Sequence, residues 1–175
     1  MADSTFEPEV KRGLSWLQGM CGGNMPSLAV ECKKTQSATL SFSEVKDHQI
    51  EGLLDFEKQG FVHKMVVSQG FGSQQRFMTK TPFDFVVAGV GRGWVLVNFR
   101  FTKAAPRKDI KKGTNRCFAV GIHEYIAAKD EAIAAGRASL SYDWFVENAI
   151  ECQRLRIKKE NGTTESAWDL QKLLA

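Results

Sequence analysis

The chain has 175 residues, enough for one domain with a substantial core and too few for two. Hydrophobic residues make up 43% and charged residues 25%, a balance that excludes disordered and fibrous classes, and the formal net charge is +4. No apolar run approaches the roughly 20 residues that cross a bilayer, and the start of the chain lacks the layout of a signal peptide. We therefore expect a cytoplasmic protein that is neither secreted nor bound to a membrane.

The first part of the chain predicts two helices and four strands. Val10, Leu14 and Leu17 recur at helical spacing, and Ser43 is placed to cap a second helix. β-Branched and aromatic residues mark the strands, and Gly89, Gly91 and Gly93 favour a tight turn between the last two. In chain order we expect a helix at 7–20, a strand at 27–34, a helix at 44–59, and strands at 61–69, 81–90 and 93–101.

The second part begins with a loop and continues with both kinds of element. Pro106 and Gly113 argue against a regular element there, and Gly136 ends the helix that follows. In chain order we expect a loop at 102–116, a strand at 117–122, a helix at 123–135, a short helix within 139–149, an edge strand at 153–159 and a terminal helix at 165–175. The pattern predicts an α/β fold with a mixed central β-sheet flanked by helices, in a single domain spanning residues 1–175.

The four cysteines do not form a metal-binding pattern. They are Cys21, Cys32, Cys117 and Cys152, with no CxxC pair and no histidine cluster nearby. A zinc site is therefore not expected. We predict free thiols, with Cys32 and Cys117 acting as small hydrophobic residues within strands.

Basic residues gather in two segments, and both are suited to contacts with phosphate groups. In the first, only Asp109 opposes the positive charges between residues 100 and 116. The second contains Arg154, Arg156, Lys158 and Lys159. From the first segment we predict a DNA-binding set of Arg100, Lys103, Arg107, Lys108, Lys111 and Lys112.

Two positions of one strand carry the residue types of a metal-dependent nuclease. Alternation along the strand directs Glu31 and Lys33 to the same face and Cys32 into the core. A second carboxylate, Asp84, lies among aromatic and β-branched residues in a predicted strand, where burial requires compensation. Phosphodiester hydrolysis needs carboxylate oxygens for Mg²⁺ and a cation beside the attacked phosphate.

The order of these motifs resembles that of the RecU-like Holliday junction resolvases of the PD-(D/E)XK superfamily. In that family a strand ends in ExK, a Thr and a polar linker follow, and a helix opens with His-Gln. Here these are Glu31, Lys33, Thr35 and His48-Gln49. A later G-R-x-S-[IL] turn corresponds to residues 136–140, and the resemblance spans most of the chain.

The sequence departs from the family in the position of the metal-binding Asp. In the family it precedes the ExK strand, whereas Asp84 follows it here. We interpret this as a permuted motif order that restores the same site in space, because catalytic geometry does not depend on chain order. A competing alignment takes residues 93–103 as the strand after Asp84. It places Asn98-Phe99-Arg100 at the ExK position and predicts a catalytically inactive protein.

The resemblance implies a restriction-endonuclease-like core and a role for each site residue. Asp84 and Glu31 would bind Mg²⁺ or Mn²⁺, Lys33 would activate the attacking water and stabilise developing charge, and Gln49 would position the water or a ligand. Glu9 or Glu51 is left as a further metal ligand.

The implied substrate is branched DNA, in particular the four-way junction of DNA recombination and repair. The symmetry of a junction favours a homodimer, with the terminal helix or an exposed strand as its contact. Two alternatives remain open: a PD-(D/E)XK nuclease that acts on linear duplex DNA, and an inactive DNA-binding module with the same fold.

Overall fold

The computed structural model describes most of the chain, namely residues 6–21, 27–59, 61–66, 84–89, 91–102, 108–159 and 161–174. The helices are α1 (Phe6–Cys21), α2 (Asp47–Gln59), α3 (Ile122–Ala134) and α4 (Tyr142–Asn148), with 3-10 turns η1 (Phe42–Glu44) and η3 (Gln171–Leu174). The strands are β1 (Ser27–Thr35), β2 (Thr39–Ser41), β3 (Phe61–Val66), β4 (Asp84–Gly89), β5 (Gly91–Arg100), β6 (Asn115–Gly121), β7 (Ser139–Ser141), β8 (Ile150–Cys152), β9 (Arg154–Lys158) and β10 (Thr164–Trp168).

A mixed four-stranded sheet forms the centre of the molecule. Its strand order is β1-β5-β6-β8. β1 runs parallel to β5, whereas β6 is antiparallel to both β5 and β8. β5 is buried on both faces, which explains why its β-branched and aromatic residues give so strong a strand signal. The prediction of a mixed α/β sheet flanked by helices is confirmed.

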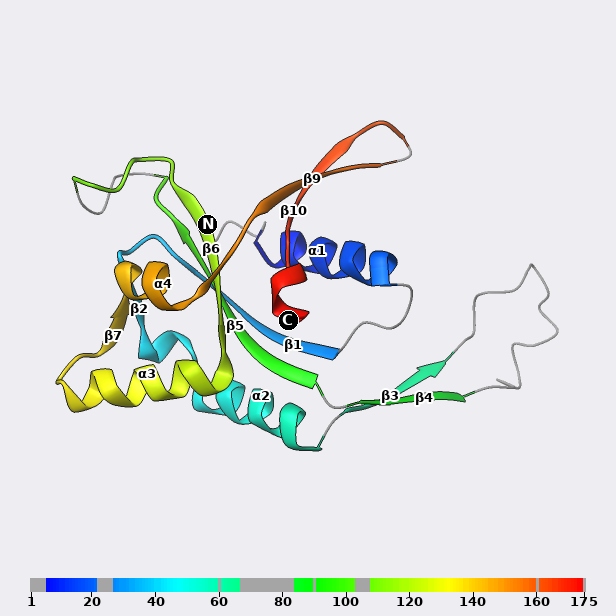
Figure 1. Cartoon of the computed structure of the whole chain (residues 1–175), viewed down its shortest axis with the longest axis horizontal. Helices are drawn as coiled ribbons and strands as arrows, with labels where there is room; N and C mark the ends of the chain where they lie inside the picture. The colour runs from blue at the N-terminus through cyan, green and yellow to red at the C-terminus, as the bar shows by residue number, and fades with distance from the viewer. Residues whose placement is uncertain are drawn as a thin grey trace.

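Helices cover the two faces of this sheet (Figure 1). On one face α1 packs with β10 and η3 around Leu96 and Trp168. On the other face α2, α3 and α4 pack around Val95, Val97 and Phe99. Since alternate residues of β1 and β5 contribute to these two clusters, the faces of β1 also differ: Cys32 packs toward the α1 side. No described helix has both the length and the apolar character needed to cross a membrane.

Two hairpins extend away from the central sheet (Figure 1). β3 and β4 form an antiparallel pair of their own, as do β9 and β10. β2 and β7 make a third small sheet beside α3 and α4. β9 follows β8 after only Gln153, so one hairpin continues directly out of the sheet.

The second helix begins later than the sequence predicts. Ser43 does not cap it; instead Ser41 caps η1 by accepting a hydrogen bond from the backbone N of Ser43. Val45 is extended (φ −100°, ψ 102°), so α2 starts only at Asp47. The polar linker thus turns once before the helix because Ser41 is held in the β2–β7 pair.

The predicted terminal helix at 165–175 is wrong. Its first half is β10, which pairs with β9 and buries Ala167 and Trp168. Only the short turn η3 is helical, and the Asp169 carboxylate accepts a hydrogen bond from Gln171 N at its start. Pairing with β9 satisfies the backbone of this segment and overrides its helical propensity.

The predicted end of α3 is confirmed. Gly136 has φ 73°, a left-handed conformation that favours glycine. The backbone N of Arg137 donates to Ala132 O at 2.8 Å, and that of Gly136 donates to Ile133 O at 2.9 Å. These bonds close the helix and direct the chain into β7.

Candidate functional site

Glu31 and Lys33 lie side by side on β1, as their spacing predicts. Lys33 Nζ is 2.9 Å from Glu31 Oε1, and both side chains are mostly shielded, with exposed fractions of 16% and 24%. Cys32 points to the opposite side, and burial raises the pKa of its thiol to about 12. β1 ends the four-stranded sheet, so the pair occupies the edge of that sheet on the α2 face.

Gln49, in the first turn of α2, joins this pair. Its Oε1 accepts from Lys33 Nζ at 3.0 Å and from the backbone N of Lys46 at 2.9 Å. Its Nε2 donates to Glu31 Oε1 at 2.9 Å. The three side chains therefore form a closed ring of contacts, which we call the Glu31–Lys33–Gln49 cluster.

The linker after β1 determines where α2 begins and so positions Gln49. Thr35 is buried, and its Oγ1 accepts from Ser37 N at 3.0 Å and donates to Thr39 O at 3.3 Å. These bonds turn the chain into β2. His48, the neighbour of Gln49, is exposed.

Glu44 is an acid of this site that the sequence reasoning missed. It lies on η1, two residues before Lys46, and is half-buried. Burial raises the pKa of its carboxyl, and the nearby Lys33 ammonium opposes that shift. Tyr125 lies close enough for the charge of Glu44 to add to burial in raising the phenol pKa to about 12. The Tyr125 hydroxyl is buried and makes no hydrogen bond among the described residues.

Asp84 does not join the cluster in the described backbone. It is the first residue of β4 and pairs with Val66 of β3 in a sheet separate from the central one. Glu31, in contrast, pairs with Val95 of β5. The side chain of Asp84 lies outside the described residues, so a cation shared by Asp84 and Glu31 stays a prediction.

The two other predicted ligands make no contact with the cluster that the structure shows. Glu9 is buried on α1, which covers the opposite face of the sheet, and its Oε1 is 2.6 Å from Arg154 Nη2. Glu51 is exposed on α2. Within the described part of the chain, no group of three or more His, Cys, Asp or Glu residues is arranged to hold a metal ion.

The predicted DNA-binding residues follow the end of β5. Lys108, Lys111 and Lys112 are exposed in the loop before β6, and Arg100 closes β5. Lys103 and Arg107 lie outside the described residues. The described part of the loop is anchored, because Ile110 is buried and Gly113 N donates to Phe101 O at 2.7 Å.

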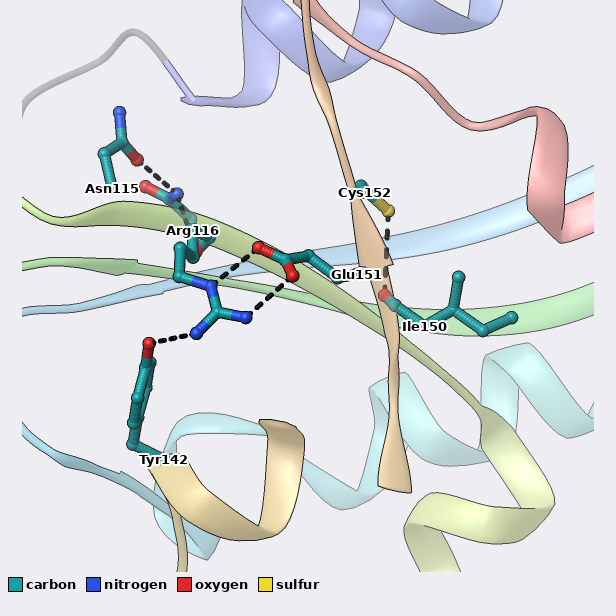
Figure 2. Close-up of polar contacts among 7 residues, drawn as sticks. Asn115, Arg116, Tyr142, Ile150, Glu151 and Cys152 are labelled. Atoms are coloured by element: carbon teal, nitrogen blue, oxygen red, sulfur yellow. Dashed lines mark hydrogen bonds and ion pairs between the residues drawn. The ribbon is translucent and has the colours of Figure 1, made fainter. Parts of the chain in front are cut away.

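Arg116, the last cation of this basic segment, is held by an ion pair (Figure 2). Its Nε and Nη2 donate to the two oxygens of Glu151 at 2.6 and 2.7 Å, and Nη1 donates to the Tyr142 hydroxyl at 2.7 Å. The guanidinium also lies over the Phe118 ring, 4.9 Å from its centroid. Arg116 therefore links β6, β8 and α4.

A second polar pair lies at the other end of α2. His123 Nε2 is 2.6 Å from Glu57 Oε2, and Glu57 Oε1 accepts from Gly93 N at 2.7 Å. They line a pocket of about 530 Å³ together with Arg92 and Trp94, among others. The most direct effect of the Glu57–His123 pair is structural, because Glu57 fastens the end of α2 to the beginning of β5.

The described cysteines, Cys32, Cys117 and Cys152, are free thiols, as predicted. Comparisons of the chain with protein family models, with curated proteins and with solved structures found no match. The resemblance to the junction resolvases therefore stays a prediction, supported by the motifs themselves.

Proposed function

We propose that the protein is a DNA endonuclease that hydrolyses phosphodiester bonds with the help of Mg²⁺ or Mn²⁺. The observation that carries the proposal is the Glu31–Lys33–Gln49 cluster, in which the acid and the amine of one predicted motif and the amide of a second make mutual contacts of 2.9–3.0 Å.

The cluster fits a hard divalent cation. Glu31 Oε1 accepts from both Lys33 and Gln49, whereas Oε2 has no donor among the described residues and keeps its lone pairs. Mg²⁺ in proteins is commonly held by one or two carboxylates together with water. When bound, such a cation lowers the pKa of a coordinated water and offsets charge on phosphate.

Each side chain then has a distinct task. Glu31 would hold the cation, while the Lys33 ammonium would stabilise the charge that develops on the attacked phosphate. Gln49 fixes the orientation of both, because its amide binds each of them at the same time. Asp84 is the second carboxylate that the sequence predicts.

Branched DNA is the proposed substrate, in particular the four-way junction, cut by a homodimer with a restriction-endonuclease-like core. This step rests on the order of the motifs from Glu31 to Gln49. The pathway would be DNA recombination and repair, and the compartment the cytoplasm. A duplex nuclease would share every catalytic residue.

An inactive DNA-binding module is the second candidate function. The placement of Asp84 in the separate β3–β4 hairpin favours it, since a PD-(D/E)XK site needs an acid beside the ExK residues.

Cleavage by a Lys33→Ala variant tests the proposal. Without the ammonium, we expect Mg²⁺-dependent cutting of a synthetic four-way junction to fall about 10²–10³-fold, while junction binding measured in EDTA stays within twofold. Lys58→Ala, an exposed lysine on α2, is the matched control. A linear duplex of the same sequence tests substrate choice.

The reverse behaviour is expected for the basic loop. Charge reversal at Lys108, Lys111 and Lys112 should weaken binding and leave the rate of cutting at saturating enzyme unchanged. Equal cleavage by the wild type and by Lys33→Ala would contradict the proposed mechanism.

A further inference from the structure

The β9–β10 hairpin is a two-stranded ribbon that extends beyond the central sheet (Figure 1). Its base is fixed because Trp168 is buried and packs edge-on against Phe6 of α1. At its tip, Lys159 N donates to Thr163 O at 2.8 Å, and Gly162 N donates to Lys159 O at 2.9 Å, with Gly162 at φ 81°. The ribbon is thus closed at both ends by specific contacts.

One face of the ribbon carries cations opposite hydroxyl groups. Arg156 pairs with Ser166 and Lys158 pairs with Thr164 across the antiparallel strands. Directly opposed residues of such a pair lie on the same face. These four side chains line a groove of about 480 Å³. The polar groups that they present are hydrogen-bond donors and hydroxyls, without a carboxylate.

The two cations of this groove are not neutralised. Arg156 and Lys158 are exposed and have no ion-pair partner among the described residues. The neighbouring Arg154 and Lys159 differ, because they pair with Glu9 and Glu165 at 2.6 and 2.7 Å.

The acid in the described strands of this hairpin, Glu165, does not reach the groove. Glu165 pairs with Ile157, so it lies on the other face of the ribbon, where Lys159 and Arg12 contact it. Among the described residues, the groove face therefore carries the uncompensated positive charge.

We propose that the β9–β10 groove binds backbone phosphates of nucleic acid through Arg156 and Lys158, with the Ser166 and Thr164 hydroxyls as additional hydrogen-bonding groups. The assignment of these phosphates to nucleic acid rests on the proposed function. The binding of phosphate groups as such rests on the residues of the groove. Arg, Lys, Ser and Thr are among the residues that contact phosphate oxygens in protein–DNA complexes. The major groove of DNA also admits a two-stranded ribbon.

The described residues of the tip favour nucleic acid over a lipid surface. Lys159, Asn161, Gly162 and Thr163 present no apolar side chain for insertion among headgroups. The base of the β9–β10 hairpin packs against α1, on the face of the central sheet opposite to that of the Glu31–Lys33–Gln49 cluster. The groove would therefore hold the substrate and take no part in the cleavage step.

The salt dependence of DNA binding tests this inference. Each lost phosphate contact reduces the slope of log Kobs against log salt by about 0.9 for duplex DNA. We therefore expect Arg156→Gln/Lys158→Gln to bind a labelled duplex more weakly, with a slope reduced by about 1.8. The measurement is fluorescence anisotropy in EDTA, where no cleavage occurs.

A variant with the same loss of charge provides the control. Lys11→Gln/Lys159→Gln also removes two positive charges. In the wild type, however, Lys11 is paired with Glu7 and Lys159 with Glu165. This variant should keep the slope of the wild type. Identical slopes for the two double variants, or no DNA binding by the wild type, would overturn the inference.

Two further outcomes separate this inference from the proposed function. DNA binding that depends on Arg156 and Lys158 in a protein that never cuts would support the groove and refute the nuclease. Dependence on these residues for binding of anionic vesicles, with unchanged DNA binding, would show that the groove serves a lipid headgroup and would overturn the assignment to nucleic acid.

Discussion

Lys33 donates to an acid of its own strand and to an amide of α2, and this double contact fixes its ammonium at the edge of the sheet. A lysine has a flexible stem with considerable rotamer entropy, so a free one rarely keeps one position. Held in this way, the Lys33 cation and the Glu31 carboxylate form a preorganised charge pair. Preorganisation is what electrostatic stabilisation of a developing phosphate charge requires.

The second carboxylate of the site can be found by removing each candidate. The sequence predicts Asp84, whereas in the described structure Glu44 is an acid whose carboxyl pKa is raised by burial and, to a smaller extent, lowered by the charge of Lys33. We expect Glu31→Gln to weaken Mn²⁺ binding at least about tenfold, because a lost carboxylate ligand removes both charge and an oxygen. The second ligand is the acid whose amide variant, Asp84→Asn or Glu44→Gln, gives an equal loss in calorimetric titration.

Asp55→Asn is the control for that titration, since Asp55 is an exposed acid of the same helix as Gln49. Unchanged Mn²⁺ affinity in Glu31→Gln, or affinity lost equally in Asp55→Asn, would contradict a metal site at the cluster.

The residues of the cluster could be predicted because each stands in a short motif with a fixed direction. Alternation on a strand places Glu31 beside Lys33. Gln49 is expected beside them because the resemblance to the junction resolvases implies it. Glu44 could not be found in this way. Its position depends on η1, a turn created by the pairing of β2 with the distant β7.

At the scale of elements, the Arg116–Glu151 pair predicts a dependence of stability on pH. The hydrogen bonds from Arg116 lower the pKa of the Glu151 carboxyl below 4.5 in the folded state. Unfolding raises that pKa, so the pair stabilises the fold above about pH 4.5, and the contribution disappears as the pH falls through the folded value.

Glu151→Gln should therefore lower the free energy of unfolding at pH 7 and have a smaller effect at pH 3. The expected difference is below about 1 kcal/mol, because the Glu151 side chain is 45% exposed. Urea unfolding at the two pH values measures it. Glu147→Gln, an exposed acid on α4, should show no such dependence.

The packing of α1 on β10 depends on a glycine. A Cβ added at Gly13 would collide with the Trp168 carbonyl oxygen, a backbone atom, so Gly13→Ala must push the helix from the strand. Such overpacking costs about 1–3 kcal/mol. At Gly52 in α2 a Cβ meets nothing within 4 Å, and Gly52→Ala should stabilise by about 0.5–1 kcal/mol. Urea unfolding of the two variants should give opposite signs.

The long elements, the short helix α4 and the strand β9 could be predicted from the sequence, whereas the three-residue strands could not. The patterns of α1, α3, β1 and β5 are regular enough to predict each from its own residues. β2, β7 and β8 have three residues each and exist because distant segments pair with them. β10 is similar, since burial of Trp168 beneath α1 decides its conformation.

At the scale of the whole molecule, the central sheet separates the two proposed tasks. The Glu31–Lys33–Gln49 cluster lies on the α2 face at the β1 edge, and the β9–β10 groove belongs to the α1 side. A single chain would thus present the proposed cleavage site and the proposed DNA-binding groove in different directions. In a two-fold assembly, one subunit's ribbon can serve DNA that enters the site of the other.

A four-way junction offers two strands for symmetric nicks, so the proposed homodimer predicts coupled cutting. A supercoiled plasmid carrying a cruciform should be converted directly to linear product, because two sites act within the lifetime of one complex. The predicted terminal helix is not available as the dimer contact, since that segment is β10 and η3. Sedimentation should therefore establish the dimer before the plasmid assay.

Mixing subunits then tests the coupling itself. Lys33→Ala subunits in excess should capture wild-type subunits in mixed dimers that nick only one strand, so that nicked circles replace linear product. The binding surfaces are unaltered in this variant, and competition for DNA slows the reaction without changing the ratio of products. A monomeric nuclease makes its two cuts independently, and its ratio of linear to nicked product at equal extents of reaction would not respond to the added subunits. That outcome would refute the dimer and leave the chemistry of the Glu31–Lys33–Gln49 cluster untouched.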